Sequence, residues 1–306
     1  MKQAMCVSLM FILFLSQKTA QGRSAIPTDN LAYPVLLTLK ENGKPKTQAS
    51  GFYLNSGNQL YLVTARHILF KKSTKSYVLN ATSVNCLSYP RDPNDTGRIE
   101  LQLDLKVLDK KKLIVYHKRH DAAVVRIADL VSTNSDGGHK LRLVEGVKKV
   151  VIAKSGILGV DISNTRIFDK ALISNDVFIF GYPTSIGIKE TSQVDPQKPL
   201  LRKGIIAGKN TSKKTLVLDC PIYYGNSGGP VTMVEQVSMT KTEFPIIGLV
   251  SQFVPFKETW LNVTHKTSHW EVSNSGYSII TPIDAVLELL PEHVKPLLKK
   301  VESGNK

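Results

Sequence analysis

The stretch YYGNSGGPV, residues 223–231, surrounds Ser227 with glycine, asparagine and proline. Glycine allows a positive φ and lets another group approach its amide closely. A serine hydroxyl is a poor nucleophile alone, and it becomes reactive beside a base that a third group orients. The stretch is therefore either the turn that presents a nucleophile or an ordinary turn between two strands. Other residues must decide between the two.

A base and an acid occur at the ends of two apolar runs. LVTARHIL places His67 directly after one run, and HDAAVVRI places Asp121 directly before another. Strand ends on a rigid scaffold can direct side chains into a cleft. Alone, His67 is an ordinary structural histidine and Asp121 an ordinary turn residue. Three other histidines compete for the role of base: His117, His120 and His139. The joint order of histidine, aspartate and serine favours nucleophilic catalysis.

Short apolar or alternating runs predict that most of the chain forms strands. These runs cover residues 34–40, 50–54, 59–65, 99–108, 113–117, 122–127, 176–183, 203–208, 215–220, 230–234, 244–254 and 276–282. Turn-forming residues separate them, so we expect two all-β units in succession, as barrels or sandwiches.

The C-terminal segment has the pattern of a helix. Thr281 is a candidate cap, and Pro282 suits a first helical position. An apolar face follows, made of Ile283, Val286, Leu287 and Leu290. We expect residues 281–306 to form a helical segment that packs on the β units.

Three blocks, TARH, DAAVVRI and GNSGGP, resemble the catalytic blocks of the trypsin-like (chymotrypsin-fold) serine proteases, in that family's chain order. The bacterial Deg/HtrA-type branch is more similar still, through SGFYL, QLYLVTARHIL, VFIFGYP, KGIIAG and LDCPIYYGNSGGPV. The resemblance covers residues 31–285, and we expect no PDZ domain.

This resemblance implies an all-β fold with two six-stranded antiparallel β-barrels of the chymotrypsin type and a C-terminal α-helix. The first barrel with its linker would cover residues 23–170, and the second residues 171–280. The implied activity is that of a serine endopeptidase, which hydrolyses peptide bonds of proteins or peptides through an acyl-enzyme.

Carried over to this chain, the resemblance makes Ser227 the nucleophile, His67 the general base and then acid, and Asp121 the orienting carboxylate. The backbone N–H groups of Gly225 and Ser227 would form the oxyanion hole. Each such donor contributes about 10²- to 10³-fold to turnover. The glycines around Ser227 then leave an amide open and allow the sharp turn.

The same resemblance assigns substrate-binding residues. Ser251, in GLVSQF, would lie on the strand that pairs with an extended peptide. Ile222, Tyr223 and Phe253 would line a pocket for an apolar side chain. Pro221 stands where an acid gives trypsins their preference for lysine and arginine, so we expect no such preference.

Two residues depart from the family pattern. Asn226 replaces the aspartate that pairs with a newly cut N-terminus in digestive trypsins, so we expect no activation of that kind. Arg66 occupies a position next to His67 that is usually small.

Residues 1–22 have the pattern of a secretory signal: Lys2, a short apolar run over residues 6–15, and a polar end with small residues at Ala20 and Gly22. An uncleaved amphipathic anchor is the alternative, but the run is too short to span a bilayer. We expect export to the periplasm or the extracellular space and no transmembrane segment in the mature chain. Export leaves Cys86 and Cys220, and the sequence does not decide whether they pair.

The chain is strongly basic, with a formal net charge of +15. Its basic runs are scattered, lack interleaved aromatic residues and match no nucleic-acid-binding motif. We expect solvated basic faces with weak attraction to anionic surfaces, and no specific nucleic-acid binding. His265 and His269 do not complete a zinc site, so we expect neither a metal nor an organic cofactor.

Two other functions remain open. A secreted chymotrypsin-fold binding protein that has lost catalytic activity would have the same fold, although such proteins usually lack part of the triad. A basic protein that binds an anionic polymer would show salt-dependent binding that survives loss of Ser227.

Overall fold

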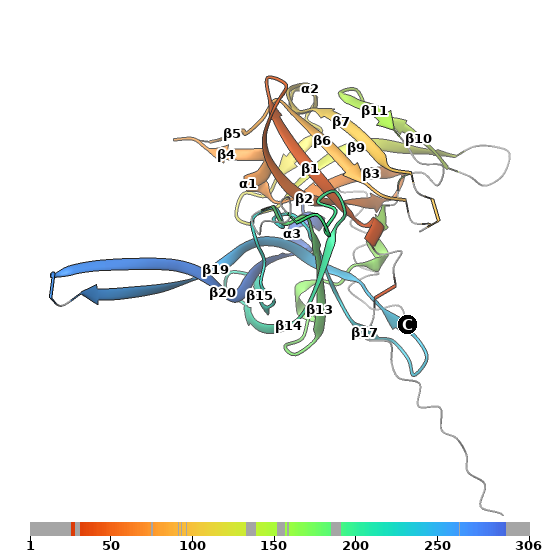
Figure 1. The fold of residues 1–306 in the computed structure, drawn as a ribbon. Helices are drawn as coiled ribbons and strands as arrows, with labels where there is room; N and C mark the ends of the chain where they lie inside the picture. Colours follow the sequence, from red (N-terminus) through yellow and green to blue (C-terminus); the bar gives the residue numbers. More distant parts are fainter. Residues whose placement is uncertain are drawn as a thin grey trace, which may run out of the picture.

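The structure is a computed structural model that describes residues 26–291, except residues 28–30, 75, 91, 93, 96, 133–138, 152–156, 158, 185–190 and 263. The predicted signal over residues 1–22 and the last part of the predicted C-terminal helical segment lie outside the described residues. Two β units follow one another along the chain (Figure 1).

The first unit is a ten-stranded sheet with the path β10-β9-β3-β2-β1-β6-β7-β11. Off this path, β12 pairs with β2 in the parallel sense and β8 pairs with β9. The strands are β1 (Pro34–Glu41), β2 (Lys44–Ser56), β3 (Gln59–Thr64), β6 (Ser83–Ser88), β7 (Ile99–Asp104), β8 (Ile114–Tyr116), β9 (Ala123–Ser132), β10 (His139–Leu143), β11 (Val147–Val151) and β12 (Val160–Asp161). A separate two-stranded sheet contains β4 (Phe70–Lys72) and β5 (Tyr77–Leu79).

This unit pairs ten strands where six were expected, and its path has two ends, β10 and β11, among the described residues. Four short strands make the difference: β10 and β11 extend the two ends of the path, and β8 and β12 pair with β9 and β2 away from it. Its curled sheet encloses a core that includes Leu37, Phe52, Leu62 and Val124.

The second unit is a closed barrel of six strands in the order β13-β14-β15-β20-β19-β16, with antiparallel pairing throughout. The expected six-stranded antiparallel barrel is confirmed here. Its strands are β13 (Asp176–Gly181), β14 (Leu200–Asn210), β15 (Thr215–Asp219), β16 (Pro230–Met233), β19 (Ile246–Asn262) and β20 (Thr267–Pro282). A small pair, β17 (Glu235–Gln236) and β18 (Thr242–Glu243), lies beside it.

The two cysteines lie in different cores. Cys86 is buried in the core of the first unit and Cys220 in that of the barrel, and both are free thiols. The sequence left open whether the two cysteines pair. They do not form a disulfide in this structure, because they lie in separate cores.

The predicted strand over residues 99–108 is only partly correct. Strand β7 ends at Asp104, and helix α2 (Leu105–Lys110) follows. The Asp104 carboxylate accepts a hydrogen bond from the Val107 amide at 3.1 Å, which caps the helix. Leu105 and Leu108, three residues apart, are both buried by this turn of helix.

The predicted cap of the C-terminal helix is wrong. Pro282 is the last residue of β20, and α3 (Asp284–Leu287) begins without a side-chain cap. Thr281 lies in the strand instead. The predicted apolar face is buried, because Ile283, Val286 and their neighbours pack into the core of the first unit. The end of the described chain thus ties the barrel to the first sheet.

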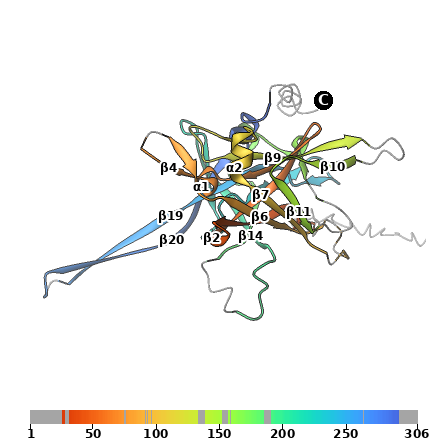
Figure 2. The same cartoon turned by 90° about the horizontal axis from the view of Figure 1, so that it is seen from above.

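Strands β19 and β20 continue beyond the barrel as a long two-stranded arm (Figures 1 and 2). The register runs from Phe256 opposite Ser273 to Asn262 opposite Thr267. The sequence predicted only residues 244–254 and 276–282, because the arm has no core-facing side and therefore no clear apolar alternation. The remaining short elements are α1 (Arg66–Leu69), η2 (Ile162–Asn164) and η3 (Phe168–Lys170).

Candidate active site

His67 and Asp121 are brought together by two neighbouring strands. His67 lies in α1, directly after β3, and Asp121 directly precedes the start of β9. Strands β3 and β9 pair with Thr64 opposite Ala123, so the two side chains emerge at the same end of the sheet. Helix α1 is held in place by Asn80, whose side-chain amide donates to the Ile68 carbonyl at 3.1 Å.

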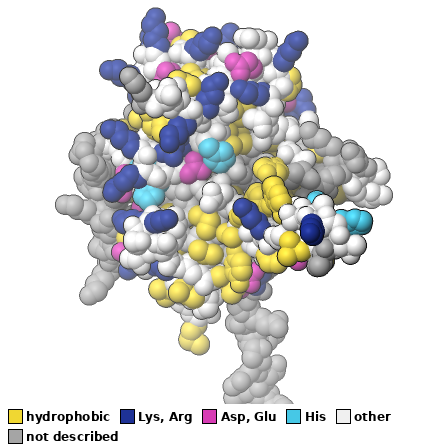
Figure 3. Space-filling view, turned by 90° about the vertical axis from the view of Figure 1, so that its left-hand side faces the viewer, with side chains coloured by type: hydrophobic (Ala, Val, Ile, Leu, Met, Phe, Trp, Pro, Cys, Tyr) yellow, Lys and Arg dark blue, Asp and Glu magenta, His cyan; other side chains and the backbone are white. Residues whose placement is uncertain are grey.

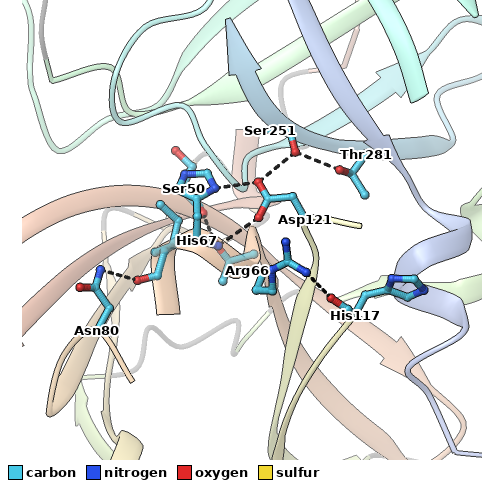
Figure 4. A network of polar contacts seen from close by, with 10 residues as sticks. Ser50, Arg66, His67, Asn80, His117, Asp121, Ser251 and Thr281 are labelled. Atoms are coloured by element: carbon cyan, nitrogen blue, oxygen red, sulfur yellow. Dashed lines mark hydrogen bonds and ion pairs between the residues drawn. The ribbon is translucent and has the colours of Figure 1, made fainter. Parts of the chain in front are cut away.

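The Asp121 carboxylate holds His67 by two hydrogen bonds (Figure 4). Its Oδ2 lies 2.7 Å from His67 Nδ1, and its Oδ1 accepts from the His67 backbone amide at 3.0 Å. A carboxylate at Nδ1 favours the tautomer that carries its proton there, which leaves Nε2 free to accept a proton. The arrangement can therefore orient His67 as a general base.

Asp121 remains ionised at neutral pH. Burial acts to raise the pKa of its carboxyl group, but hydrogen bonds from His67 and Ser251 and the charge of a protonated His67 outweigh burial. The pKa of Asp121 therefore lies below its ordinary value.

A chain of hydroxyl groups supports the carboxylate from the barrel. Ser251 Oγ donates to Asp121 Oδ2 at 3.0 Å, and the Ser251 and Thr281 hydroxyl oxygens are 2.9 Å apart. The single Ser251 proton is directed to Asp121, so Thr281 must donate to Ser251. Sequence reasoning placed Ser251 beside the substrate but did not find Thr281.

Ser227 follows a turn that requires glycine. The Asn226 amide donates to the Tyr223 carbonyl at 3.0 Å, and Gly225 has a φ of +97°. A positive φ at the third position of such a turn is typical of type II, which favours glycine there. A Cβ at residue 225 would also collide with the Tyr182 carbonyl oxygen. Only glycine fits this position.

The loop around Ser227 is anchored to both units. The Ser50 amide donates to the Ser227 carbonyl at 3.0 Å, and the Ser50 hydroxyl donates to the Gly225 carbonyl at 2.7 Å. The Gly228 amide donates to the Val250 carbonyl at 2.8 Å. Sequence reasoning did not assign Ser50 a role, although it lies in the SGFYL block.

The amides of Gly225 and Ser227 donate to no protein acceptor in the described part of the chain. Their neighbours at Asn226, Gly228 and Gly229 are all hydrogen-bonded. Two open N–H groups, one on the serine itself and one two residues before it, can stabilise an oxyanion.

These groups share one cleft of about 1240 Å³. Every residue predicted for the site lines it: His67, Asp121, Ser227, Gly225, Ser251, Ile222, Tyr223 and Phe253. The structure therefore brings together base, acid, serine and open amides from both units.

Residues 49–236 match the family model described as a trypsin-like peptidase domain. This match covers more than half of the chain. The chain belongs to the trypsin-like peptidase family. It therefore carries a peptidase domain of the serine-protease type.

Three solved structures are among those that are similar to this chain. The serine endoprotease of Yersinia pestis is 16% identical, with a TM-score of 0.44, over 92% of this chain and 70% of that one. The protease Anisep of Arthrobacter nicotinovorans is 15% identical, with a TM-score of 0.43, over 82% of this chain and 90% of that one. The thermostable serine protease AL20 of an extremophilic microorganism is 12% identical, with a TM-score of 0.46, over 85% of this chain and 95% of that one. A search of curated proteins found no match.

Within this peptidase domain, the predicted pocket residues have different environments. Ile222 is buried in the barrel core, and Phe253 packs against that core. The Tyr223 ring stacks with the Arg202 guanidinium, 4.7 Å from the ring centroid. Tyr224, which sequence reasoning missed, is 69% exposed and meets Phe253 edge-on at 5.9 Å. An aromatic residue next to the turn glycine was the available signal.

The two departures from the family pattern have structural explanations. Asn226 is buried, and its side-chain oxygen accepts from the Tyr223 amide at 3.2 Å. Arg66 donates to the carbonyls of His117 and Lys118 at 2.6 and 2.9 Å. It thereby braces the loop that leads to Asp121 (Figure 4).

No group of three or more His, Cys, Asp or Glu side chains that could hold a metal ion occurs among the described residues. No helix in that part of the chain is long and apolar enough to cross a membrane.

Proposed function

We propose that this protein is a serine endopeptidase in which Ser227, His67 and Asp121 form the catalytic triad. The observation that carries the proposal is the 2.7 Å contact between His67 Nδ1 and Asp121 Oδ2, in the same cleft as Ser227 and two open amides. A serine, an oriented base and an oxyanion site within one cleft are the components of acyl transfer.

In the first half of the reaction, His67 Nε2 takes the Ser227 proton while Oγ bonds to the scissile carbonyl carbon. The amides of Gly225 and Ser227 stabilise the oxyanion that forms. The carbon–nitrogen bond then breaks, and the leaving amine takes the proton from His67. Asp121 stays ionised and stabilises the imidazolium.

In the second half, His67 takes a proton from water, and the resulting oxygen nucleophile attacks the ester carbonyl on Ser227. Collapse of this second oxyanion breaks the bond to Oγ, which recovers its proton from His67. The acid product then leaves, and the Ser227 hydroxyl is regenerated.

An extended substrate would bind by strand addition beside Ser251 in β19. Strand β16 pairs with β19 from Ile246 to Leu249, and the first part of β19 after Ser251 lines the cleft. Ile222, Tyr223 and Phe253, with Tyr224, offer an apolar surface to one substrate side chain. A strict preference for lysine or arginine at the cleaved bond would contradict this apolar pocket.

Hydrolysis of a quenched-fluorescent peptide library tests the proposal. We expect cleavage by the native protein, with loss of activity in Ser227→Ala and His67→Ala by about 10³-fold or more. Both variants should have the same melting temperature as the native protein. A folded native protein that binds peptides but cleaves none would support the alternative, a catalytically inactive chymotrypsin-fold binding protein.

We also propose that residues 1–22 direct export and are removed, on the basis of their sequence pattern alone. N-terminal sequencing of the protein recovered from an exporting host checks this. A new N-terminus near residue 23 is expected, and an intact Met1 in the exported fraction would contradict it.

A further inference from the structure

The cleft around Ser227 has a pronounced positive charge. Five Lys and Arg residues line it, against two acids: Lys46, Arg66, Arg119, Lys213 and Lys214, with Asp121 and Glu288. Figure 3 shows one face of the molecule on which Lys and Arg side chains gather near histidine and acidic side chains. Asp121 is already committed to His67, so it does not offset this charge at the rim.

Two of the five cations already have partners. Lys46 contacts Glu41 and the Asn80 carbonyl at 2.9 and 2.7 Å. Arg66 donates to two backbone carbonyls and stacks on Tyr77 at 4.4 Å. Neither side chain is available to a substrate without breaking these contacts.

The other three cations, Arg119, Lys213 and Lys214, form what we call the basic rim. All three are exposed, and none makes an ion pair within the described residues. Arg119 stands two residues before Asp121, whereas Lys213 and Lys214 lie in the turn between β14 and β15. The basic rim therefore joins the first unit and the barrel across one cleft.

The backbone of the basic rim is held in place. The Lys213 amide donates to Asn210 Oδ1 at 3.0 Å, which fixes the turn. The Arg119 and His120 amides donate to His117 Nδ1 at 3.1 and 2.9 Å. Because the backbone is fixed, binding of a partner has to order only the side chains of these three residues.

The positive charges of the basic rim affect the pKa of His120. Burial lowers the pKa of its imidazole, and the nearby His117, Arg119 and Lys214 lower it further. Glu288 acts in the opposite direction, but its carboxylate contacts His117 Nε2 at 3.0 Å. The positive charges are thus only partly offset.

We propose that the basic rim selects polypeptide segments with acidic side chains close to the scissile bond. This inference rests on the proposed function, since it names the substrate class of the same cleft. Arg119, Lys213 and Lys214 supply counter-charges for Asp or Glu, which both attract the segment and disfavour basic ones. The charge of the rim does not act in the chemical step.

Paired peptides that differ only by Glu or Gln, scanned through the positions around one cleaved bond, test the proposal. We expect kcat/KM to be higher for Glu at one or more positions. In the Arg119→Gln, Lys213→Gln, Lys214→Gln triple variant, kcat/KM should fall about tenfold for the Glu peptide and little for the Gln peptide. A single exposed ion pair contributes up to about fivefold. Raised salt should reduce the difference in the same way.

A control triple variant, Lys148→Gln, Lys149→Gln, Lys257→Gln, removes the same charge from exposed residues that do not line the cleft. It should keep the Glu preference. Equal rates for Glu and Gln peptides, or equal losses in the two triple variants, would overturn the inference.

Binding to the Ser227→Ala variant separates this inference from the proposed function. Fluorescence anisotropy of the same labelled peptides reports the Glu preference even if the native protein cleaves nothing. A rim-dependent preference for Glu supports the inference whatever the activity. A rim-dependent preference for a single-stranded oligonucleotide over the Glu peptide would assign the rim to nucleic acid and overturn it.

Discussion

The Ser251 hydroxyl lies 3.0 Å from Oδ2 of Asp121, so the barrel directly supports a carboxylate contributed by the first unit. The same oxygen contacts His67, and Thr281 completes the chain of hydroxyl groups behind it. The geometry of the proposed triad therefore depends on the docking of the two units, and single hydroxyl groups can test that dependence.

Replacement of Ser251 by alanine should lower kcat/KM by about tenfold or more, because a hydrogen bond to a charged group contributes about 1.5–3 kcal/mol. Thr281→Val, which removes the donor to Ser251, should have a smaller effect in the same direction. Steady-state hydrolysis of one good peptide checks both.

Ser278→Ala is the matched control for these two variants. Its buried hydroxyl has no hydrogen-bond partner among the described residues, so its loss should leave activity unchanged and should not lower the free energy of unfolding. If Ser251→Ala behaved like Ser278→Ala, the hydroxyl chain would have no functional role.

Asp121→Asn should lower kcat by about 10⁴-fold, because an amide at this position no longer specifies the His67 tautomer that leaves Nε2 free. Circular dichroism should remain native, because asparagine has the same shape, while the melting temperature falls by the stabilisation that the ionised carboxylate contributes. A loss below tenfold in a folded variant would exclude Asp121 as the orienting group.

The depressed pKa of Asp121 also predicts a pH dependence of stability. The folded carboxyl has a pKa below its ordinary value of 3.8, so the unfolded state binds the proton more readily. The stabilisation from Asp121 is then complete above the unfolded pKa and is lost as the pH falls through the folded value. Urea unfolding of native protein and Asp121→Asn from pH 3 to 7 should show a difference that is constant near neutrality and shrinks below about pH 4. A difference that grew with acidification would contradict this sign.

Gly228 and Gly276 separate backbone strain from crowding. Both have a positive φ, +83° and +87°, but a Cβ at residue 228 would meet Thr64 and Ser50, whereas residue 276 has open space. Gly276→Ala should cost about 1–2 kcal/mol from conformation alone. Gly228→Ala should cost clearly more and abolish activity. Equal free energies of unfolding for the two variants would show that the loop adjusts.

The free thiols give a prediction about reactivity. Burial raises the pKa of Cys86 to about 12 and that of Cys220 to about 11. In a Cys6→Ser protein we expect almost no reaction with a thiol reagent in the native state and two thiols in urea. A mass loss of two hydrogens, with no thiol in urea, would reveal a disulfide that the separate cores do not allow.

Much of the fold was predictable because strands that face a core either alternate apolar and polar residues, as in β7, or form a short apolar run, as in β13. The six strands of the second barrel and the residues assigned to the cleft were expected from the family resemblance. The arm of β19 and β20 was not, because its exposed residues obey no core pattern.

The missed site residues share a different cause. Ser50, Thr281 and Tyr224 act through contacts between segments far apart in the chain, and a serine, threonine or tyrosine in a strand or turn carries no sequence signal for such a contact. The basic rim was visible only as two scattered basic runs, since the fold alone brings Arg119 and Lys214 to one cleft.

Labelling of the purified protein with a fluorophosphonate probe, followed by mass mapping of the adduct, tests the central claim most directly. We predict one adduct, on Ser227, that is absent in Ser227→Ala and strongly reduced in His67→Ala. A folded native protein that takes up no probe, or takes it up equally in His67→Ala, would contradict the assignment of Ser227 as an activated nucleophile.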